Sequence, residues 1–357
     1  MTEEETRLSD IGERELVRRL LGRIPAAPDV PVGVGDDAAA VALESPVLVT
    51  ADALVEGVHF LRESAPARLL GRKALTVNLS DVAAMGGVSR HALVSLCLPS
   101  ELELTWVDSL YDGLLERAAE VGVSLVGGNV ARSPAGVVVN VTLLGEAPQP
   151  LLRSGAQPGD LVVVTGELGA AAEGVKLLRQ GARLNEDGEL SATGIWTESS
   201  ADAVYACLRA QLDPRPPLAL ARSLAERGLA RAAMDLSDGL SSDLAVMCAQ
   251  SGLGARVEAS AVPVSPAVAG LERARGGDAL SVALHGGEDY ELLLAVAPGE
   301  FEALQELAGV WGVAVCAIGE FFAGEREVRL RDGVGEGALP PAGHDHFHAD
   351  ESEGRAE

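Results

Sequence analysis

The chain of 357 residues carries a formal net charge of −25, with Lys73 and Lys176 as its only lysines, which argues against nucleic acids and anionic membranes as partners. The four cysteines lie singly, without a C-x-x-C pair, as is typical of a reduced cytoplasm and not of a zinc site. No apolar run approaches a membrane span and no secretory signal is visible, so we expect a soluble cytoplasmic protein, long enough for two domains.

The first part of the chain is predicted to mix helices and strands. A capping box at Asp10-Ile-Gly-Glu13 begins one helix, and a second helix runs from Pro66 to the paired glycines of Met85-Gly-Gly87. Within the second helix, Asn78-Leu-Ser-Asp81 places polar side chains among apolar ones, which indicates a site. The pattern farther along predicts strands at 91–98, 124–126 and 137–144 and a helix at 106–121.

A proline-rich linker, Pro148-Gln-Pro150, places a domain boundary near residue 150. We expect an N-terminal domain at 1–150, a C-terminal domain at 151–347 and a disordered acidic tail at 348–357. The second domain is predicted to contain strands at 161–165, 255–258, 292–296 and 313–318, helices at 169–180, 218–227, 242–250 and 300–308, and a surface insertion at 181–201. Neither half follows a strict βαβ alternation, which favours an α+β fold.

Two adjacent carboxylates follow two glycines in Gly33-Val-Gly-Asp-Asp37. The glycines allow a sharp turn while both acids point at something strongly positive, which favours a metal. The stretch also fits a loose Gly-x-Gly-x-x-Ala dinucleotide pattern ending at Ala38, but a β-like segment follows instead of the required helix. Taken alone, this pair is explained equally well by a solvated acidic hairpin turn.

Further carboxylates lie beside glycine, serine or threonine and next to apolar runs, namely Asp52, Asp81 and the two acids of Asp235-Leu-Ser-Asp-Gly239. Surface solubility explains such a set poorly. Magnesium binds a few carboxylates together with phosphate oxygens and water, so acids that converge on one interdomain cleft would hold several ions. In a chain this acidic, we expect divalent cations to mediate most contacts with any polyanionic ligand.

Seven blocks stand in order between residues 10 and 347: Gly33-Val-Gly-Asp-Asp-Ala38, Thr50-Ala-Asp52, Glu56-Gly-Val-His-Phe60, Lys73–Gly86, Arg153–Asp160, Asp235-Leu-Ser-Asp-Gly239 and Gly286-Gly-Glu-Asp-Tyr-Glu-Leu292. Together they resemble the thiamine-monophosphate kinase family. The resemblance implies a two-domain α+β, ATP-binding fold, shared with aminoimidazole-ribonucleotide synthetase, selenophosphate synthetase and a hydrogenase-maturation protein. It further implies a homodimer formed by the N-terminal domains, a C-terminal α/β domain that completes the cleft, and ATP with several magnesium ions.

The resemblance also implies roles for single residues. The metal ligands would be Asp37, Thr50, Ala51 through its backbone carbonyl, Asp52, Asp81, Asn129, Asp235 and Asp238. ATP would contact Tyr111, whose ring is a candidate to stack on the base, together with Gly128, Asn129, Arg153 and Ser237. Thiamine monophosphate would face His59, Glu288 and His344.

Three of these positions depart from the family pattern. Asn129 replaces an aspartate and keeps an oxygen donor without the charge, so we expect weaker binding at one metal. Ala51 replaces a serine or threonine, and His344 stands where relatives often carry an aromatic ring. These departures bear on efficiency and substrate choice, and not on the fold.

The implied reaction is the ATP- and magnesium-dependent phosphorylation of thiamine monophosphate to thiamine diphosphate, the last step of thiamine diphosphate biosynthesis. A phosphate monoester has a second pKa near ~6, so the attacking oxygen is already anionic and we expect no catalytic base. Positioning and charge neutralisation by magnesium, helped by Arg153, would account for catalysis without a Walker loop, which does not occur here. A potassium requirement is left open.

Two other functions are kept as alternatives. One is a related ATP-dependent synthetase or maturation protein, although no cysteine precedes Cys97 and the sequence ends in Gly354-Arg-Ala-Glu357 instead of cysteine. The other is a catalytically weakened nucleotide-binding regulator, suggested by Asn129 and Ala51. Tight ATP binding without turnover of any thiamine phosphate would favour the regulator.

Overall fold

The computed structural model describes residues 6–30, 41, 43, 46–191, 197 and 200–343. Its helices are α1 (Leu8–Leu21), α2 (Ala67–Ala84), α3 (Leu104–Val121), α4 (Ala170–Arg179), α5 (Ala201–Leu212), α6 (Leu218–Arg227), α7 (Leu240–Ser251), α8 (Pro266–Arg275), α9 (Ala279–His285) and α10 (Phe301–Val310). Its strands are β1 (Val47–Val55), β2 (Val88–Leu98), β3 (Ser124–Arg132), β4 (Val138–Glu146), β5 (Leu161–Thr165), β6 (Ala232–Asp235), β7 (Gly254–Glu258), β8 (Leu292–Val296), β9 (Val315–Phe322), β10 (Val328–Arg331) and β11 (Glu336–Ala338). The predicted motif at 33–37 with Asp37, the predicted substrate residue His344 and the acidic tail lie outside the described residues.

The chain divides into two compact units. Unit 1 contains Met1–Leu151, Leu177–Ala201 and Leu212–Arg227, and unit 2 contains Leu152–Lys176, Asp202–Gln211 and Gly228–Glu357. The chain therefore returns to unit 1 twice after first entering unit 2. The first crossing lies between Leu151 and Leu152, and the division into domains at 1–150 and 151–347 stays a prediction.

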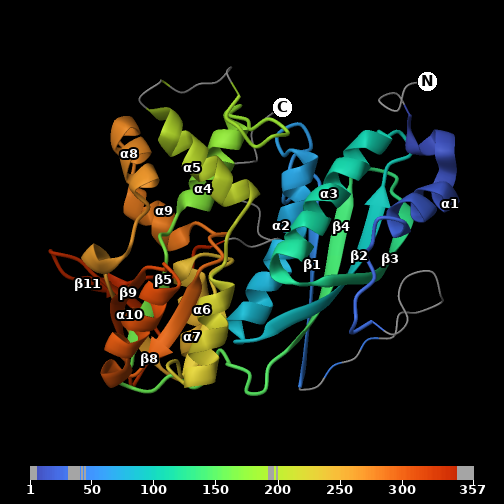
Figure 1. Ribbon diagram of the computed structural model, residues 1–357. Coiled ribbons are helices and arrows are strands. Elements are labelled where there is room, and N and C mark those ends of the chain that lie inside the picture. Colours follow the sequence, from blue (N-terminus) through green and yellow to red (C-terminus); the bar gives the residue numbers. More distant parts are fainter. Residues whose placement is uncertain are drawn as a thin grey trace. The chain divides into compact units, whose positions relative to one another are not determined.

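Unit 1 is built on a four-stranded sheet in the order β1-β4-β2-β3. Strand β4 pairs antiparallel with β1 and β2, and β2 pairs parallel with β3. Alternate β4 residues, Val139, Val141 and Leu143, are fully buried, and α2 and α3 lie along one face of this sheet (Figure 1). On the other face, Val49 of β1 keeps 66% of its surface exposed. The sheet thus has a helix-covered face and an open face.

Two glycines allow α2 and α3 to cross in close contact. A Cβ atom on Gly71 would lie 1.9 Å from the carbonyl oxygen of Leu110, and one on Gly113 would lie 1.8 Å from that of Arg68. No side chain can be accommodated at either position unless the helices move apart. This crossing fixes α2, the helix that carries the Asn-Leu-Ser-Asp segment.

Unit 2 is built on a seven-stranded sheet in the order β11-β10-β7-β9-β5-β8-β6. The pairing is antiparallel except between β10 and β7. Every residue of β8 is buried, in keeping with its continuous apolar sequence. Helix α7 packs against β6, β7, β8 and β10. Its apolar residues Leu240, Leu244 and Met247 belong to the core of this unit.

The mixture of helices and sheets confirms the predicted α+β class, and β5, α6 and β8 occupy their predicted ranges. The capping-box prediction is wrong in position, because α1 begins at Leu8 and the carboxylate of Asp10 accepts a hydrogen bond from the N–H of Arg7 at 2.9 Å. Helices α5, α8 and α9 and strands β10 and β11 have no counterpart among the predicted elements. Every helix in the described part of the chain is too short or too polar to cross a bilayer.

Candidate functional site

Strand β1 and helix α2 bring three predicted metal ligands of unit 1 together. Thr50 and Asp52 are two residues apart on β1, so both side chains lie on the face that α2 covers. The hydroxyl of Thr50 donates a hydrogen bond to Oδ2 of Asp81, in the last turn of α2, at 2.5 Å. The carboxyl groups of Asp52 and Asp81 are also hydrogen-bonded to each other.

The pairing of two acids changes the proton affinity of Asp52. Burial contributes most, the negative charge of Asp81 and the hydrogen bond between the two groups add to it, and together they raise the pKa of Asp52 to about 6. Two carboxylates at this separation repel each other when both are ionised. A divalent cation bound by both would remove the repulsion, so the donor set fits magnesium.

Asn78 is a residue of this site that the predicted ligand set does not include. Its side-chain oxygen accepts a hydrogen bond from the N–H of Asp52 at 3.1 Å, and its side-chain nitrogen donates one to the carbonyl of Ala74 at 3.2 Å. Because Asn78 is fully buried, it ties α2 to β1 beside the acid pair. The polar segment on an apolar helix is the sequence signal that pointed to it.

Asn129 lies far from the acid pair within one chain. It is on β3, at the sheet edge opposite β1. Its register partners across the sheet are Ser95, Asn140 and Ala53. Three inter-strand spacings, roughly 14 Å along the sheet, therefore separate Asn129 from β1. Asn129 also shares the open face with Ala53, whereas Asp52 faces α2.

The two neighbouring predictions, Gly128 and Ala51, are placed by the same sheet. A Cβ atom on Gly128 would lie 1.9 Å from the carbonyl oxygen of Val94 on β2, so the close approach of the two strands already requires glycine there. Ala51 is exposed, and its side chain lies on the open face between those of Val49 and Ala53. Contact of Gly128 with ATP stays a prediction.

His59 follows the end of β1, where its Nδ1 accepts a hydrogen bond from the N–H of Val55 at 3.0 Å. In the neutral ring, Nε2 then carries the proton. Tyr111 is in the core of unit 1, with the guanidinium of Arg23 at 5.7 Å from its ring centroid. Burial raises the pKa of Tyr111 to about 12, against the opposing effect of Arg23. Stacking of this ring on a base stays a prediction.

In unit 2, the turn from β6 to α7 gathers acids. Asp235 ends β6 and Asp238 stands just before Gly239, whose φ of 104° allows the chain to enter α7. Asp243, in the first turn of α7, accepts hydrogen bonds from the N–H groups of Asp238 at 3.2 Å and Gly239 at 3.1 Å. Burial, followed by the charges of Asp238 and Asp235, raises the pKa of Asp243 to about 7.

Asp243 was not among the predicted site residues. It is 2% exposed and lies on the side of α7 that also carries the buried Leu240 and Met247. An acid at a position where the helical period calls for an apolar residue is the signal that could have identified it.

The structure brings two further predicted residues, Ser237 and Glu288, into contact. The N–H of Glu288 donates to the carbonyl of Ser237 at 2.8 Å, and the N–H of Tyr290 donates to that of Leu236 at 2.9 Å. Glu288 and Tyr290 adopt left-handed φ values of 68° and 51°, which are uncommon for residues with a side chain and often mark functional segments. The carboxylate of Glu288 accepts a hydrogen bond from Nε2 of Gln211 at 2.7 Å.

Arg153 lies beside the start of β6, in a segment that continues toward Arg231. The N–H of Ala233 on β6 donates to the carbonyl of Leu152 at 2.9 Å, which places the next residue, Arg153, beside this strand. Arg153 is exposed and forms no ion pair with the described residues. The following loop is held by Asp160, which is 1% exposed and accepts a hydrogen bond from Arg231 at 2.8 Å. A cation on an anchored loop suits the binding of a phosphate group.

Each unit therefore carries acids that lie close together, and unit 2 adds a solvent-facing arginine. Within the described residues, no three histidine, cysteine or acidic side chains form a complete metal site by themselves. Such partial sets are typical of magnesium, which takes its remaining ligands from phosphate oxygens and water. The arrangement can hold a polyphosphate through metal ions.

Comparison with known proteins places this fold and its acids in the class of AIR synthase related proteins. The model of the N-terminal domain of that class matches residues 35–147, and the model of its C-terminal domain matches residues 157–331. The match agrees with the fold predicted from the sequence motifs.

Relatives within this class specify the family. The thiamine-monophosphate kinase of Salmonella typhimurium is 36% identical over 340 residues, which are 94% of this chain and 98% of the relative. The crystal structure of thiamine-monophosphate kinase from Stenotrophomonas maltophilia has a TM-score of 0.75 and 34% identity, and the match covers 89% of this chain and 94% of that one. The structure of AaThiL complexed with AMPPCP and TMP has a TM-score of 0.73 and 29% identity, with 96% and 99% covered. The chain belongs to the thiamine-monophosphate kinase family, as predicted.

Proposed function

We propose that the protein transfers the γ-phosphoryl group of ATP to thiamine monophosphate and forms thiamine diphosphate and ADP. The observation that carries this proposal is the match to AaThiL, whose structure contains AMPPCP and TMP and whose chain is covered over 99% of its length. A phosphate oxygen of thiamine monophosphate attacks the γ-phosphorus, a new P–O bond forms, and the bond to ADP breaks. The attacking oxygen is already anionic at neutral pH, so the chain does not need to supply a base.

Magnesium fits the acids of both units. We assign Thr50, Asp52 and Asp81 to this role in unit 1 and Asp235 and Asp238 in unit 2, with Asp37, the carbonyl of Ala51 and Asn129 as the further predicted ligands. Bound magnesium would neutralise phosphate charge and polarise the transferred group. The raised pKa values of Asp52 and Asp243 support this assignment, because burial and then the charges of neighbouring acids raise both.

The chain's own residues bind and orient the two substrates. Arg153 contacts a phosphate of ATP, and Ser237 binds the same nucleotide beside Glu288. Thiamine monophosphate is contacted by His59, Glu288 and His344, and the nucleotide is contacted by Tyr111 and Gly128. Asn78 and Asp243 bind neither substrate: they hold β1 and the β6–α7 turn, where the acids lie. Catalysis then rests on bringing the two phosphates into line.

We also propose a homodimer formed through the open face of the unit 1 sheet. Val47 and Val49 of this face are 45% and 66% exposed, and an uncovered, partly apolar sheet face is a common interface. A two-fold axis there would bring the β3 edge of one protomer toward the β1 edge of its partner. Because the acid pair lies on the helix-covered face of β1, Asn129 would reach the pair of the partner subunit around the β1 edge, which offsets its roughly 14 Å separation from β1 within one chain.

Mixed dimers test this arrangement. Asp81→Asn and Asn129→Lys are purified separately as inactive proteins, unfolded, mixed and refolded together. If the two residues serve the same site from different protomers, about a quarter of the parental activity returns, because half of the dimers are mixed and each contains one intact site. Absence of any recovery in verified mixed dimers would place both residues in one protomer and contradict the proposal.

The reaction itself is tested by anion-exchange analysis after incubation with ATP, magnesium and thiamine monophosphate, beside a reaction with free thiamine. We expect thiamine diphosphate from the monophosphate alone. Repeating the assay in sodium and in potassium salts decides whether potassium is needed. Tight ATP binding without this product would instead favour the regulator. We place the reaction in the cytoplasm, a location supported by the four free cysteines.

A further inference from the structure

Gln211 is a buried polar residue near the end of α5, and it contacts a residue of the proposed acceptor site. It is 4% exposed, and its Nε2 donates a hydrogen bond to Oε2 of Glu288 at 2.7 Å, across 77 positions of sequence. We propose that Gln211 is a positioning residue, which holds the carboxylate of Glu288 in the orientation that receives thiamine monophosphate. This inference rests on the proposed function and names a residue that acts on the acceptor through Glu288.

The backbone of Glu288 is fixed, but its side chain needs a separate restraint. The N–H of Glu288 is bonded to the carbonyl of Ser237, and a Cβ atom on the preceding Gly287 would lie 2.5 Å from that same carbonyl oxygen. A glutamate still has three rotatable side-chain bonds, and ordering them costs conformational entropy. The amide of Gln211 selects one of these orientations before the substrate arrives. As a hydrogen-bond donor it also favours the ionised carboxylate.

Thiamine chemistry explains why an ionised, oriented carboxylate is useful here. Thiamine monophosphate carries a cationic thiazolium ring and an aminopyrimidine, and a carboxylate can pair with the former or accept a hydrogen bond from the latter. The adenine of ATP also carries an amino group, but ATP has no cationic ring. A residue that orients Glu288 should therefore affect binding of the acceptor more than binding of ATP.

Gln211 can restrain Glu288 because α5 is itself held tightly against α4. A Cβ atom on Gly174 of α4 would lie 2.3 Å from the carbonyl oxygen of Cys207 and 2.8 Å from Cβ of Gln211. The two helices therefore touch through the backbone of a glycine, directly beside Gln211. The backbone of Gln211, from which the amide reaches Glu288, therefore has little freedom to move.

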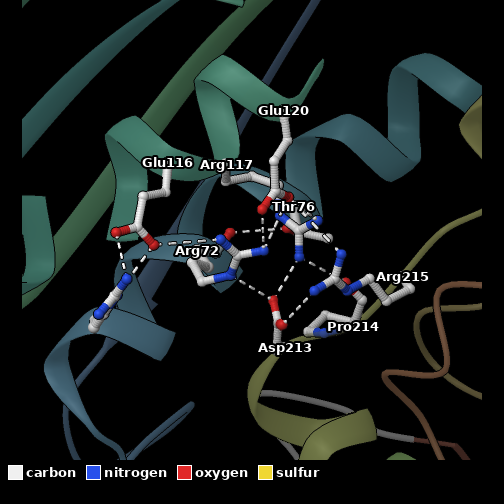
Figure 2. A network of polar contacts seen from close by, with 9 residues as sticks. Arg72, Thr76, Glu116, Arg117, Glu120, Asp213, Pro214 and Arg215 are labelled. Carbon is white, nitrogen blue, oxygen red and sulfur yellow. Dashed lines mark hydrogen bonds and ion pairs between the residues drawn. The ribbon is translucent and has the colours of Figure 1, made fainter. Parts of the chain in front are cut away.

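A second anchor follows two residues along the chain. Asp213, whose side chain is fully buried, accepts hydrogen bonds from Arg72 at 3.0 Å, Arg117 at 2.5 Å and Arg215 at 2.9 Å. Figure 2 shows these three guanidinium groups converging on the Asp213 carboxylate, with Glu120 bound to Arg72 beside them. Unit 1 therefore resumes, directly after Gln211, with an acid that three arginines hold.

The test replaces the amide of Gln211 without changing the length of the side chain. Gln211→Met removes the donor and keeps an unbranched apolar chain, and Gln211→Glu places a second carboxylate against Glu288. We expect the KM for thiamine monophosphate to rise about tenfold in Gln211→Met, as for loss of one hydrogen bond to a charged group, with the KM for ATP within about twofold of the parent. A larger rise is expected in Gln211→Glu. The control is Gln305→Met, at an exposed glutamine of α10.

A double-mutant cycle separates positioning from a general structural role. In the Glu288→Ala background, Gln211→Met should have no further effect on the KM for thiamine monophosphate, since its action passes through that carboxylate. Equal increases in the KM for both substrates, or an effect of Gln211→Met that persists without Glu288, would overturn the proposal. If Gln211→Met does not fold, Gln211→Glu is measured in the same cycle with Glu288→Gln, which should relieve the repulsion and lower the raised KM.

The parent enzyme distinguishes failure of this inference from failure of the proposed function. If the parent forms thiamine diphosphate and Gln211→Met retains the parental KM, Gln211 does not position Glu288. If the parent forms no thiamine diphosphate, the acceptor itself is wrong, and the positioning role is rejected together with the function on which it rests.

Discussion

Asp213 and Asp52 are both aspartates of unit 1 that folding removes from solvent, yet their surroundings are opposite. Burial alone would raise the pKa of Asp213, but Arg117, Arg72 and Arg215 outweigh it and hold that pKa below its ordinary value (Figure 2). Asp52 has the carboxyl group of Asp81 as its neighbour, and burial followed by the charge of Asp81 raises the pKa of Asp52 to about 6. Asp243 in unit 2 resembles Asp52, because burial and the charges of Asp238 and Asp235 raise its pKa to about 7.

The difference separates structural acids from candidate ligands. Around Asp213 the protein supplies the countercharge itself, so the cluster joins α2, α3 and the 212–217 segment without needing a ligand. Around Asp52 the structurally described residues supply no such countercharge, and a cation must supply it when both acids are ionised. Two aspartates of one unit therefore have different roles, decided by the sign of the neighbouring charge.

The largest expected effect comes from removing one acid of the Asp52–Asp81 pair. Asp81→Asn should reduce kcat for thiamine diphosphate formation by two to three orders of magnitude, about the loss seen when one preorganised charge-stabilising group is removed. The melting temperature should stay unchanged or rise, because a repulsion between acids is relieved without loss of core volume. Asp187→Asn, an exposed aspartate of the same unit, is the control, and near-parental kcat in Asp81→Asn would refute the assignment.

The same substitution at Asp213, the acid surrounded by arginines, should mainly lower the stability of the fold. Asp213→Asn leaves three arginines around a neutral side chain, and breaking a buried ion pair from one side costs about 3–5 kcal/mol of unfolding free energy. Urea unfolding of this variant and of Asp202→Asn, at an exposed position of α5, measures the difference. A stable Asp213→Asn that has lost activity would mean that the cluster contributes directly to the reaction.

Sequence motifs located the clustered acids of both units but not Asp213. The blocks around Asp52, Asp81 and Asp235 stood out because polar residues interrupt apolar runs, and such interruptions are visible in one dimension. Asp213 stands directly before Pro214-Arg-Pro-Pro217, in a segment that looks like an ordinary loop. Its partners Arg72 and Arg117 lie 141 and 96 positions away, and pairings at that separation depend on the tertiary fold.

Contacts made by helix α5 were not predicted either, because they also depend on the tertiary fold. Helix α5 was not predicted, so Gln211 could not be assigned to any element, and its bond to Glu288 depends on α4, α5 and the 286–291 segment at once. The family resemblance supplied the fold and the acids position by position. It could not supply sheet register, which is why the separation of Asn129 from Asp52 emerged only from the strand order.

A smaller effect is expected from the pH dependence of Asp289, an acid in unit 2 whose side chain accepts hydrogen bonds from backbone N–H groups. Asp289 accepts hydrogen bonds from the N–H of Gly169 at 2.9 and 3.1 Å, at the start of α4, and burial raises its pKa to about 8. A folded pKa above the ordinary value of 3.8 means that the folded state binds the proton more tightly. The contribution to stability is therefore fully present below pH ~4 and is lost as the pH rises through about 8.

The substitution Asp289→Asn removes this titration. Between pH 5 and pH 8 the unfolding free energy of the parent should decrease more steeply than that of the variant, by at most about 1.4 kcal/mol per pH unit. Urea unfolding at both pH values, without magnesium, measures the two slopes. Equal slopes for the parent and Asp289→Asn would show that folding does not raise the pKa of Asp289.

The smallest expected effect comes from adding an acid to the Asp52–Asp81 pair. If Asn129 reaches the Asp52–Asp81 pair of the partner subunit, Asn129→Asp supplies one more negative ligand and should lower the magnesium concentration for half-maximal rate about fivefold, or about 1 kcal/mol. Asn185→Asp adds the same charge at an exposed site of unit 1 and serves as the control. Because a carboxylate and an amide of equal size differ here only in charge, an unchanged magnesium requirement in Asn129→Asp would mean that position 129 does not contact the metal. The open face of the sheet would then have to be explained without a shared site.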